Sequence, residues 1–284
     1  MHDGKRLLTS LAKLWQKYER RLSQCRRTAD EDAVHKLRIS CRRLLALIQL
    51  LQALAPHSHL QKLRKRLKSQ LDDFDELRDT QVMLLEVTDR LDSLPELAAC
   101  HRHLQLNEQR LLTQLPSLLR QRDSEDLQPL VEKARKQLRS AFGDKPLTPL
   151  VLAAVDNCYR EALERHRQTD PGDPATLHSL RIALKKLRYM LASARELLPD
   201  LPDSQFDRMQ VHLTRLGEIQ NSRVLSDNLN RFFGHLPPPA VQTHYQHRHQ
   251  ALLDDYMQHA GEILRFWRAK PDLPFPWQRQ EFRP

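Results

Sequence analysis

The sequence predicts an all-α fold, and three observations support that prediction. Apolar residues recur every three or four positions along most of the chain, as they do on amphipathic helices. The 284 residues include only six glycines, and the abundant residues are the helix formers Leu, Ala, Gln, Arg, Lys and Glu. Clusters of Pro, Asp and Gly separate the periodic stretches, as expected at helix junctions. We therefore expect helices and no β-sheet.

In the first part of the chain the periodicity predicts helices over residues 7–22, 34–54, 59–94, 96–119 and 123–142. The first two are joined around residues 28–32. Pro56 and Pro95 end the second and third of these helices, because proline cannot continue a helix, and Pro116 is a point at which the fourth could bend. Residues 143–149 (GDKPLTP) predict a turn, which we take as the midpoint of the chain.

In the second part the expected helices cover residues 150–167, 174–198, 203–233 and 239–267. The segments TDPGDP, LPDLPD and GHLPPP separate them. Residues 269–284 contain prolines every few positions, so they cannot stay helical. We expect a tail there that packs through Phe275 and Trp277.

The charge of the chain indicates an anionic partner. Its 46 Lys and Arg residues exceed its 36 Asp and Glu residues, which leaves a formal net charge of +10. Nucleic acid, a membrane surface and polyphosphate all fit this excess, and charge alone does not choose among them.

The cysteines and the start of the chain indicate the compartment. Cys25, Cys41, Cys100 and Cys158 form no CxxC pair, so we expect reduced thiols in the core. The N-terminal residues lack the apolar run of a signal peptide, and no stretch approaches the ~18 apolar residues of a membrane span. We expect a cytoplasmic protein that does not insert into membranes.

Two pairs of segments recur in the same order along the chain. Residues 34–47 (VHKLRISCRRLLAL) align without gaps with residues 177–190 (LHSLRIALKKLRYM), and residues 75–82 (DELRDTQV) are similar to residues 217–224 (GEIQNSRV). The first alignment matches His35 with His178, Arg38 with Arg181, Arg42 with Lys185, and Arg43 with Lys186. We therefore predict a duplicated four-helix bundle. Its halves are residues 1–142 and 143–268, related by a pseudo-twofold axis around a basic central surface.

The recurring segments carry basic stripes. His35, Arg38 and Arg42 lie within about 60° of one another on a helix. In the second copy the row extends from His178 to Arg188, along roughly 15 Å of helix. Residues 33–71 and 174–195 contain no Asp or Glu, so cations in these spans have no acidic partner on their own helix. We therefore expect an external anion. The principal candidate residues are His35, Arg38, Arg42, Arg43, His178, Arg181, Lys185, Lys186 and Arg188. Further candidates are Lys36, Lys62, Arg64, Lys65, Arg66, Lys68 and Arg208. For the five between residues 62 and 68, a solvated basic face is an equally good interpretation.

The paired H-x-L-R-x-x-x-[RK]-[RK]-L segments, each followed by the second block, resemble the CHAD family, the conserved-histidine α-helical domain. The similarity spans about residues 5–268. The resemblance implies two four-helix bundles around a basic surface that binds inorganic polyphosphate, sometimes at polyphosphate granules, and it implies no catalysis. Two departures from the repeat stand out. Leu45 occupies the place that matches Arg188, and residues 220–221 (QN) stand where residues 78–79 (RD) occur in the first copy. The acidic strands of an accompanying triphosphatase domain are absent from this sequence.

Three functions fit these features. Polyphosphate binding uses the duplicated stripe directly, because forked guanidinium donors match phosphate oxygens. A nucleic-acid-binding protein would share the electrostatics, but aromatic residues are sparse and are not interleaved with the stripe. A phosphohydrolase would use the histidines as acid–base groups or as phosphate acceptors, yet neither copy supplies a partnered nucleophile. We expect no catalytic residue, metal or cofactor.

Overall fold

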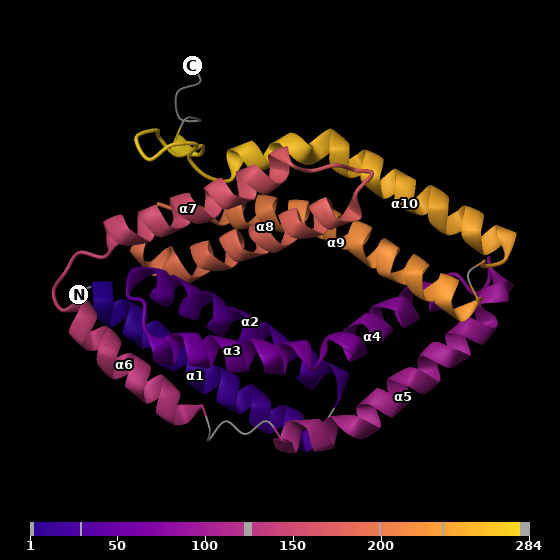
Figure 1. Ribbon diagram of the computed structural model, residues 1–284, viewed down its shortest axis with the longest axis horizontal. Coiled ribbons are helices and arrows are strands. Elements are labelled where there is room, and N and C mark those ends of the chain that lie inside the picture. Colours follow the sequence, from indigo (N-terminus) through magenta and orange to yellow (C-terminus); the bar gives the residue numbers. More distant parts are fainter. Residues whose placement is uncertain (1–2, 29, 122–126, 199, 235, 279–284) are drawn as a thin grey trace. The chain divides into compact units, whose positions relative to one another are not determined.

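The computed structural model describes residues 3–28, 30–121, 127–198, 200–234 and 236–278. These residues form helices, turns and bends and no strands, which confirms the predicted all-α fold (Figure 1). The α-helices are α1 (Asp3–Thr28), α2 (Glu31–Leu54), α3 (Ser58–Asp72), α4 (Asp75–Thr88), α5 (Ala98–Gln121), α6 (Gln128–Phe142), α7 (Thr148–Arg167), α8 (Pro174–Ala194), α9 (Asp203–Phe232) and α10 (Pro239–His259). No helix in these ranges combines the length and apolar character needed to cross a membrane.

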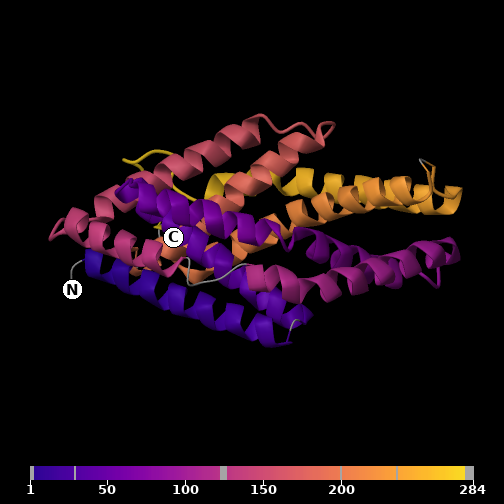
Figure 2. The same cartoon turned by 60° about the horizontal axis from the view of Figure 1, so that its bottom comes forward.

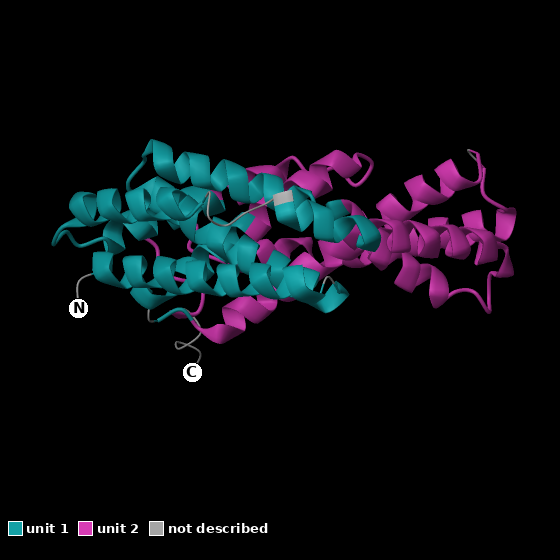
Figure 3. Ribbon diagram, turned by 90° about the horizontal axis from the view of Figure 1, so that it is seen from below, with its two compact units in different colours: residues 1–75, 112–159, 186–201 teal, residues 76–111, 160–185, 202–284 magenta. Residues whose placement is uncertain are grey.

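The helices group into two compact units, coloured separately in Figure 3. Unit 1 comprises Met1–Asp75, Leu112–Tyr159 and Lys186–Leu201, and unit 2 comprises Glu76–Leu111, Arg160–Lys185 and Pro202–Pro284. Each unit thus takes segments from both sides of the predicted midpoint. The halves 1–142 and 143–268 rest on the sequence repeat, and the duplication and its twofold axis stay predictions.

Unit 1 contains a four-helix bundle made of α1, α2, α3 and α6, which lie side by side in Figures 1 and 2. The helices form a ring, because α1 packs on α2, α2 on α3, α3 on α6, and α6 on α1. Leucines of the predicted apolar stripes fill the interior, including Leu11, Leu37 and Leu63, each fully buried. Burial of such stripes supplies most of the stability of a bundle of this kind.

Several buried polar side chains of the unit 1 bundle are hydrogen-bonded. The indole N–H of Trp15 donates to Oε1 of Gln128 over 2.5 Å, and the Tyr18 hydroxyl donates to Gln70. The four cysteines are buried and free, as expected from their spacing. Burial raises the pKa of the Cys41 thiol to about 12, so this group stays protonated and donates to the Leu67 carbonyl.

In unit 2, α9 packs along α10, and a separate apolar cluster joins them to α4 and the start of α5. Its buried members are Met83, Val87, Leu94, Leu97, Cys100, Leu104, Leu225, Leu229, Val241 and Tyr245. Farther along α10, an ion pair between Arg248 and Glu86 at 2.7 Å links α10 to α4. The cluster includes Leu225 and Leu229 of α9, so it packs the C-terminal end of this long helix against α4, α5 and α10.

The single helix predicted over residues 59–94 is wrong. The structure has two helices there, α3 and α4, separated by a turn at Asp73 and Phe74. The amide of Asp73 donates to Ser69 and that of Phe74 to Leu71, which closes a tight turn and buries the Phe74 ring. No proline or glycine marks this break, and Phe74 continues the apolar periodicity. For both reasons the apolar periodicity did not predict the break between α3 and α4.

Other predicted helix ends differ from the structure. The predicted helix 239–267 ends at His259 and continues as the 3-10 helix Ala260–Arg265, and α8 ends at Ala194 before the 3-10 helix Arg195–Leu197. The predicted start of helix 123–142 lies outside the described residues. The tail packs as expected, because the rings of Phe275 and Trp277 stack on each other and lie 4.7 and 5.8 Å from the Trp267 ring.

Candidate functional site

Helix α2 carries the first basic stripe. Its start is fixed by Asp30, whose side chain accepts a hydrogen bond from the Ala33 amide over 2.7 Å, as an N-cap residue does. The apolar positions Val34 and Leu37 then face the core of unit 1. This register leaves His35 and Arg43 exposed and Arg42 half-buried.

Arg38 does not face solvent, which corrects the expectation that it reaches an external anion. The residue is 4% exposed. One nitrogen of its guanidinium donates to Oδ1 of Asp75 over 2.8 Å, and another donates to the Leu71 carbonyl over 3.2 Å. The residue therefore ties α2 to the junction between α3 and α4.

The expectation that cations in residues 33–71 lack acidic partners is also wrong for Lys36, which pairs with Asp32. Both partners lie just outside the acid-free span, Asp32 before it and Asp75 after it. Asp32 lies on the same helix as Lys36, four residues earlier, because α2 begins at Glu31 and not at the predicted residue 34. The Asp75 carboxylate comes from a different helix, which periodicity does not reveal.

The candidate residues of α2 and α3 other than Lys36 and Arg38 form a group that we name the α2–α3 cation cluster. Its members are His35, Arg42, Arg43, Lys62, Arg64, Lys65, Arg66 and Lys68. All five members on α3 are exposed, because Leu60, Leu63 and Leu67 occupy the face of α3 that packs on the bundle. Six members, namely Arg42, Arg43, Lys62, Arg64, Lys65 and Lys68, form no ion pair with any residue that the structure describes.

The second stripe lies on α8. His178 is exposed, and its Nδ1 lies 3.0 Å from Oε1 of Gln220 on α9. Arg181 is half-buried against Gly217. A Cβ built at Gly217 would lie 3.4 Å from Nη2 of Arg181. The glycine therefore leaves room for the guanidinium beside the backbone of α9.

The other candidates lie farther along these helices. Lys185 is the last residue of its segment of unit 2, whereas Lys186 and Arg188 belong to unit 1, and all three are half-buried. Arg208 is exposed on α9. The second stripe thus runs through a helix that is shared between the two units.

The second recurring block was assigned no binding role from the sequence, yet it contacts the stripe in both copies. In unit 1 it supplies Asp75 to Arg38. In unit 2 it supplies Gly217 and Gln220, beside Arg181 and His178. The recurrence of the block was the signal that could have identified these residues as neighbours of the stripe.

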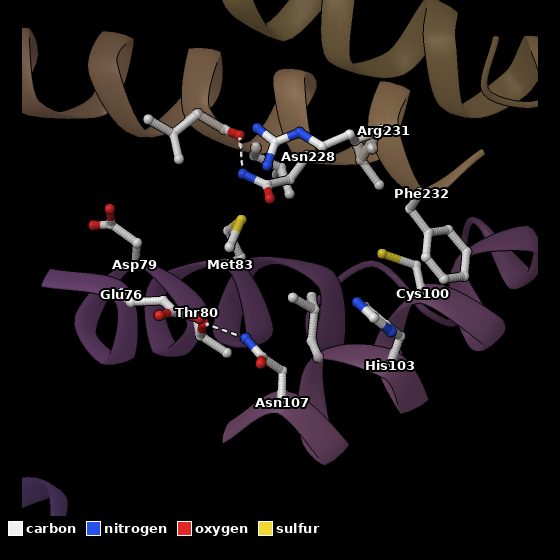
Figure 4. Close-up of a pocket in the computed structure, with 14 residues that line it drawn as sticks. Glu76, Asp79, Thr80, Met83, Cys100, His103, Asn107, Asn228, Arg231 and Phe232 are labelled. Carbon is white, nitrogen blue, oxygen red and sulfur yellow. Dashed lines mark hydrogen bonds between the residues drawn. The ribbon is translucent and has the colours of Figure 1, made fainter. Parts of the chain in front are cut away.

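A pocket in unit 2 is drawn in Figure 4. It has a volume of about 670 Å³ and is lined by residues of α4, α5 and α9. Its polar groups include the carboxylates of Glu76 and Asp79 and the amide of Asn107, which donates to the Thr80 hydroxyl over 3.1 Å. None of the predicted site residues lines it. Carboxylates at the wall disfavour a polyanion there.

Comparisons with known proteins agree with this architecture. A sequence model of the CHAD domain matches residues 6–230. The fold is similar to the crystal structure of the CHAD domain from the plant Ricinus communis, with a TM-score of 0.64 and 18% sequence identity over 93% of this chain and 89% of that one. No curated protein matches the sequence.

Proposed function

Because the chain belongs to the CHAD domain family, we propose that it binds inorganic polyphosphate and catalyses no reaction on it. The observation that carries the proposal is that six cations of the α2–α3 cation cluster, on two adjacent helices, form no ion pair with any described residue. They are Arg42, Arg43, Lys62, Arg64, Lys65 and Lys68. Uncompensated cations in a row can neutralise successive phosphates of a polymer.

The composition of the cluster suits a flexible chain of phosphates. Arginines offer forked donors that bind two phosphate oxygens at once, and lysines supply compact charges. Binding should release the counterions condensed on the polymer, so affinity should fall steeply as the salt concentration rises. In unit 2, His178 and Arg181 would contribute through the same chemistry.

Calorimetric titration tests the proposal. Polyphosphates of increasing length should bind with increasing affinity, and the affinity should fall with salt. Lys65→Gln combined with Lys68→Gln should weaken binding at least about fivefold, since two phosphate contacts are lost. A matched control, Lys13→Gln combined with Arg20→Gln, removes the same charge from exposed positions of α1 and should change the affinity less than twofold.

Nucleic acid is the second candidate, favoured by the same cations. RNA or DNA of matched charge should bind more weakly than polyphosphate, because aromatic side chains such as Trp15 and Tyr18 are buried in unit 1 and present no face for base stacking. Equal or tighter binding of the nucleic acid would contradict the proposal.

A phosphohydrolase is the third candidate. We propose binding alone, which predicts that the protein releases no phosphate from polyphosphate in the presence of Mg²⁺, Mn²⁺ or Zn²⁺. Metal-dependent release abolished by His35→Ala and His178→Ala would establish catalysis instead. We further propose that the protein acts in the cytoplasm, including the surface of polyphosphate granules, where a fluorescent fusion should colocalise with them.

A further inference from the structure

A second pocket lies in unit 1, in the groove between α1 and α6, with a volume of about 460 Å³. One side carries Lys5 from the start of α1, and the other side carries Arg135 and Arg139 from α6. Apolar side chains lie between them, namely Leu8 and Ala12 on α1 and Phe142 on α6. The groove therefore combines three cations with an apolar lining, and no carboxylate lines it.

Helical spacing places these groups. Arg135 and Arg139 are four residues apart, so they lie on the same face of α6, one turn from each other. Lys5 and Thr9 have the same relation on α1, as have Leu8 and Ala12. The α1 side of the groove thus presents one polar and one apolar row to the cations of α6.

The cations of this groove have no electrostatic partner among the described side chains. Within the described residues, the side chains of Lys5, Arg135 and Arg139 form no ion pair and no hydrogen bond. The acids nearest in sequence to Lys5 and Arg135 are Asp3 and Glu132, and both form hydrogen bonds with other residues. Asp3 accepts hydrogen bonds from the amides of Leu147 and Thr148, and Glu132 accepts one from Gln128. Three uncompensated positive charges therefore face one cavity.

The groove is separate from the α2–α3 cation cluster. In the ring of the unit 1 bundle, α1 and α6 form one edge, and α2 and α3 form the opposite edge. A polymer held by exposed side chains of α3 would have to cross the bundle to enter the groove. The two sets of cations can therefore be tested independently.

We propose that the α1–α6 groove binds a phosphate monoester that carries an apolar group. The three cations match the charge of a phosphate, and Leu8, Ala12 and Phe142 bury the apolar part of the ligand. Bare polyphosphate has no apolar part and gains nothing from this lining. The volume lies within the range of roughly 300–1,000 Å³ that is typical of small-ligand pockets. This inference goes beyond the proposed function and does not depend on it.

Calorimetry with n-hexyl phosphate and inorganic phosphate tests the proposal on the full chain. Hexyl phosphate should bind at least about tenfold more tightly than inorganic phosphate, since burial of roughly two methylene groups accounts for that factor. Arg135→Gln combined with Arg139→Gln should reduce the affinity for hexyl phosphate about tenfold or more. The same variant should bind polyphosphate as the unchanged protein does.

The reciprocal variant keeps the two proposals distinguishable. Lys65→Gln combined with Lys68→Gln should retain hexyl phosphate binding and lose polyphosphate affinity. Vesicles of phosphatidylcholine with and without phosphatidic acid identify the source of the phosphate. Binding that needs phosphatidic acid, Arg135 and Arg139 assigns the groove to a lipid headgroup, whereas binding of soluble hexyl phosphate alone assigns it to a free metabolite.

Two results would overturn the inference. One is equal affinity for hexyl phosphate and inorganic phosphate, which would mean that the apolar lining contributes nothing. The other is unchanged hexyl phosphate binding after the loss of Arg135 and Arg139. Circular dichroism and thermal unfolding of each variant establish that the bundle is intact. Arg139 is exposed and Arg135 is half-buried, and neither side chain forms an ion pair or hydrogen bond with a described residue, so folding should be preserved.

Discussion

The guanidinium of Arg38 and the carboxylate of Asp75 form an ion pair at 2.8 Å in which the arginine side chain is 5% exposed and the aspartate side chain 53%. At the matching positions of the second copy, Arg181 lies beside Gly217, which carries no carboxylate. The two aligned arginines therefore have different surroundings. Arg38 ties α2 to the junction between α3 and α4, whereas Arg181 lies against the backbone of α9 at Gly217.

Asp75→Asn should destabilise the protein by about 1–2 kcal/mol. The change leaves the nearly buried Arg38 charge with a weaker partner, and exposure of Asp75 moderates the loss. Urea unfolding measures this difference. Asp72→Asn, at an exposed position three residues earlier, removes the same charge and should cost less than about 0.5 kcal/mol. Equal effects of the two substitutions would show that the ion pair adds nothing.

Gly217→Asp should weaken polyphosphate binding several-fold, because it places a carboxylate beside Arg181 as Asp75 lies beside Arg38. Gly217→Ala is the matched control. Its Cβ would meet only the flexible end of Arg181, at 3.4 Å, so binding should be preserved. Stability should rise by about 0.5–1 kcal/mol, since alanine favours a helix interior more than glycine does. Calorimetry and thermal unfolding of both variants measure the two effects, and equal binding by both would exclude Arg181 as a ligand contact.

Gly4→Ala should destabilise unit 1 by about 1–2 kcal/mol. Its Cβ would lie 2.9 Å from Cβ of Phe142, so α1 and α6 would have to separate, and the better helix propensity of alanine offsets only part of that cost. Gly261→Ala provides the comparison, because no atom lies within 4 Å of its added Cβ. Chemical unfolding should show a lower unfolding free energy for Gly4→Ala only. An unchanged unfolding free energy for Gly4→Ala would mean that α1 and α6 separate at no cost.

Stability should fall as the pH is lowered from 7.5 to 5 because of His212. Burial, with Arg215 as a smaller cause, lowers the pKa of this histidine to about 4, and the rings of Tyr256 and Phe266 lie against it. The unfolded chain takes up a proton near pH 6.5 and the folded chain does not, so the stabilisation is complete above that pH. It is lost as the pH approaches 4. The loss of unfolding free energy from this histidine is roughly 2 kcal/mol at pH 5.

His212→Phe isolates this contribution, because it keeps an aromatic ring in the same apolar surroundings without a titrating group. Between pH 7.5 and pH 5, the unfolding free energy of the variant should fall by roughly 2 kcal/mol less than that of the unchanged protein. If both proteins show the same pH dependence, His212 is not the titrating group.

The sequence predicted helices well where long amphipathic stretches end at prolines. The start of α8 at Pro174 and the end of α2 before Pro56 follow directly from that pattern. The break at Asp73 and Phe74 could not be predicted, because an apolar residue in register conceals a turn that is closed by backbone hydrogen bonds. A change from α-helix to 3-10 helix, as at Ala260, also leaves the apolar periodicity nearly intact.

For the candidate site, periodicity was sufficient to place His35 and Arg43 on the solvent side of α2. It could not give the surroundings of Arg38, since the decisive carboxylate is 37 residues away on a different helix. The α1–α6 groove was missed for the same reason. Lys5 and Arg139 are ordinary surface cations in the sequence, and only the packing of the two helices brings them to one cavity. Polyphosphate binding itself stays a prediction.

The division of the chain into interleaved units also constrains how the protein is made. Unit 1 is complete only when residues 186–201 are available, long after its first 75 residues have been synthesised. Until then, part of the apolar surface of the early helices stays exposed, either on the ribosome or bound to chaperones. Cleavage near residue 143 would leave two fragments that each lack segments of both units. If the chain is divided at that turn, neither fragment should fold when it is expressed alone. Folding should require that both fragments are expressed together.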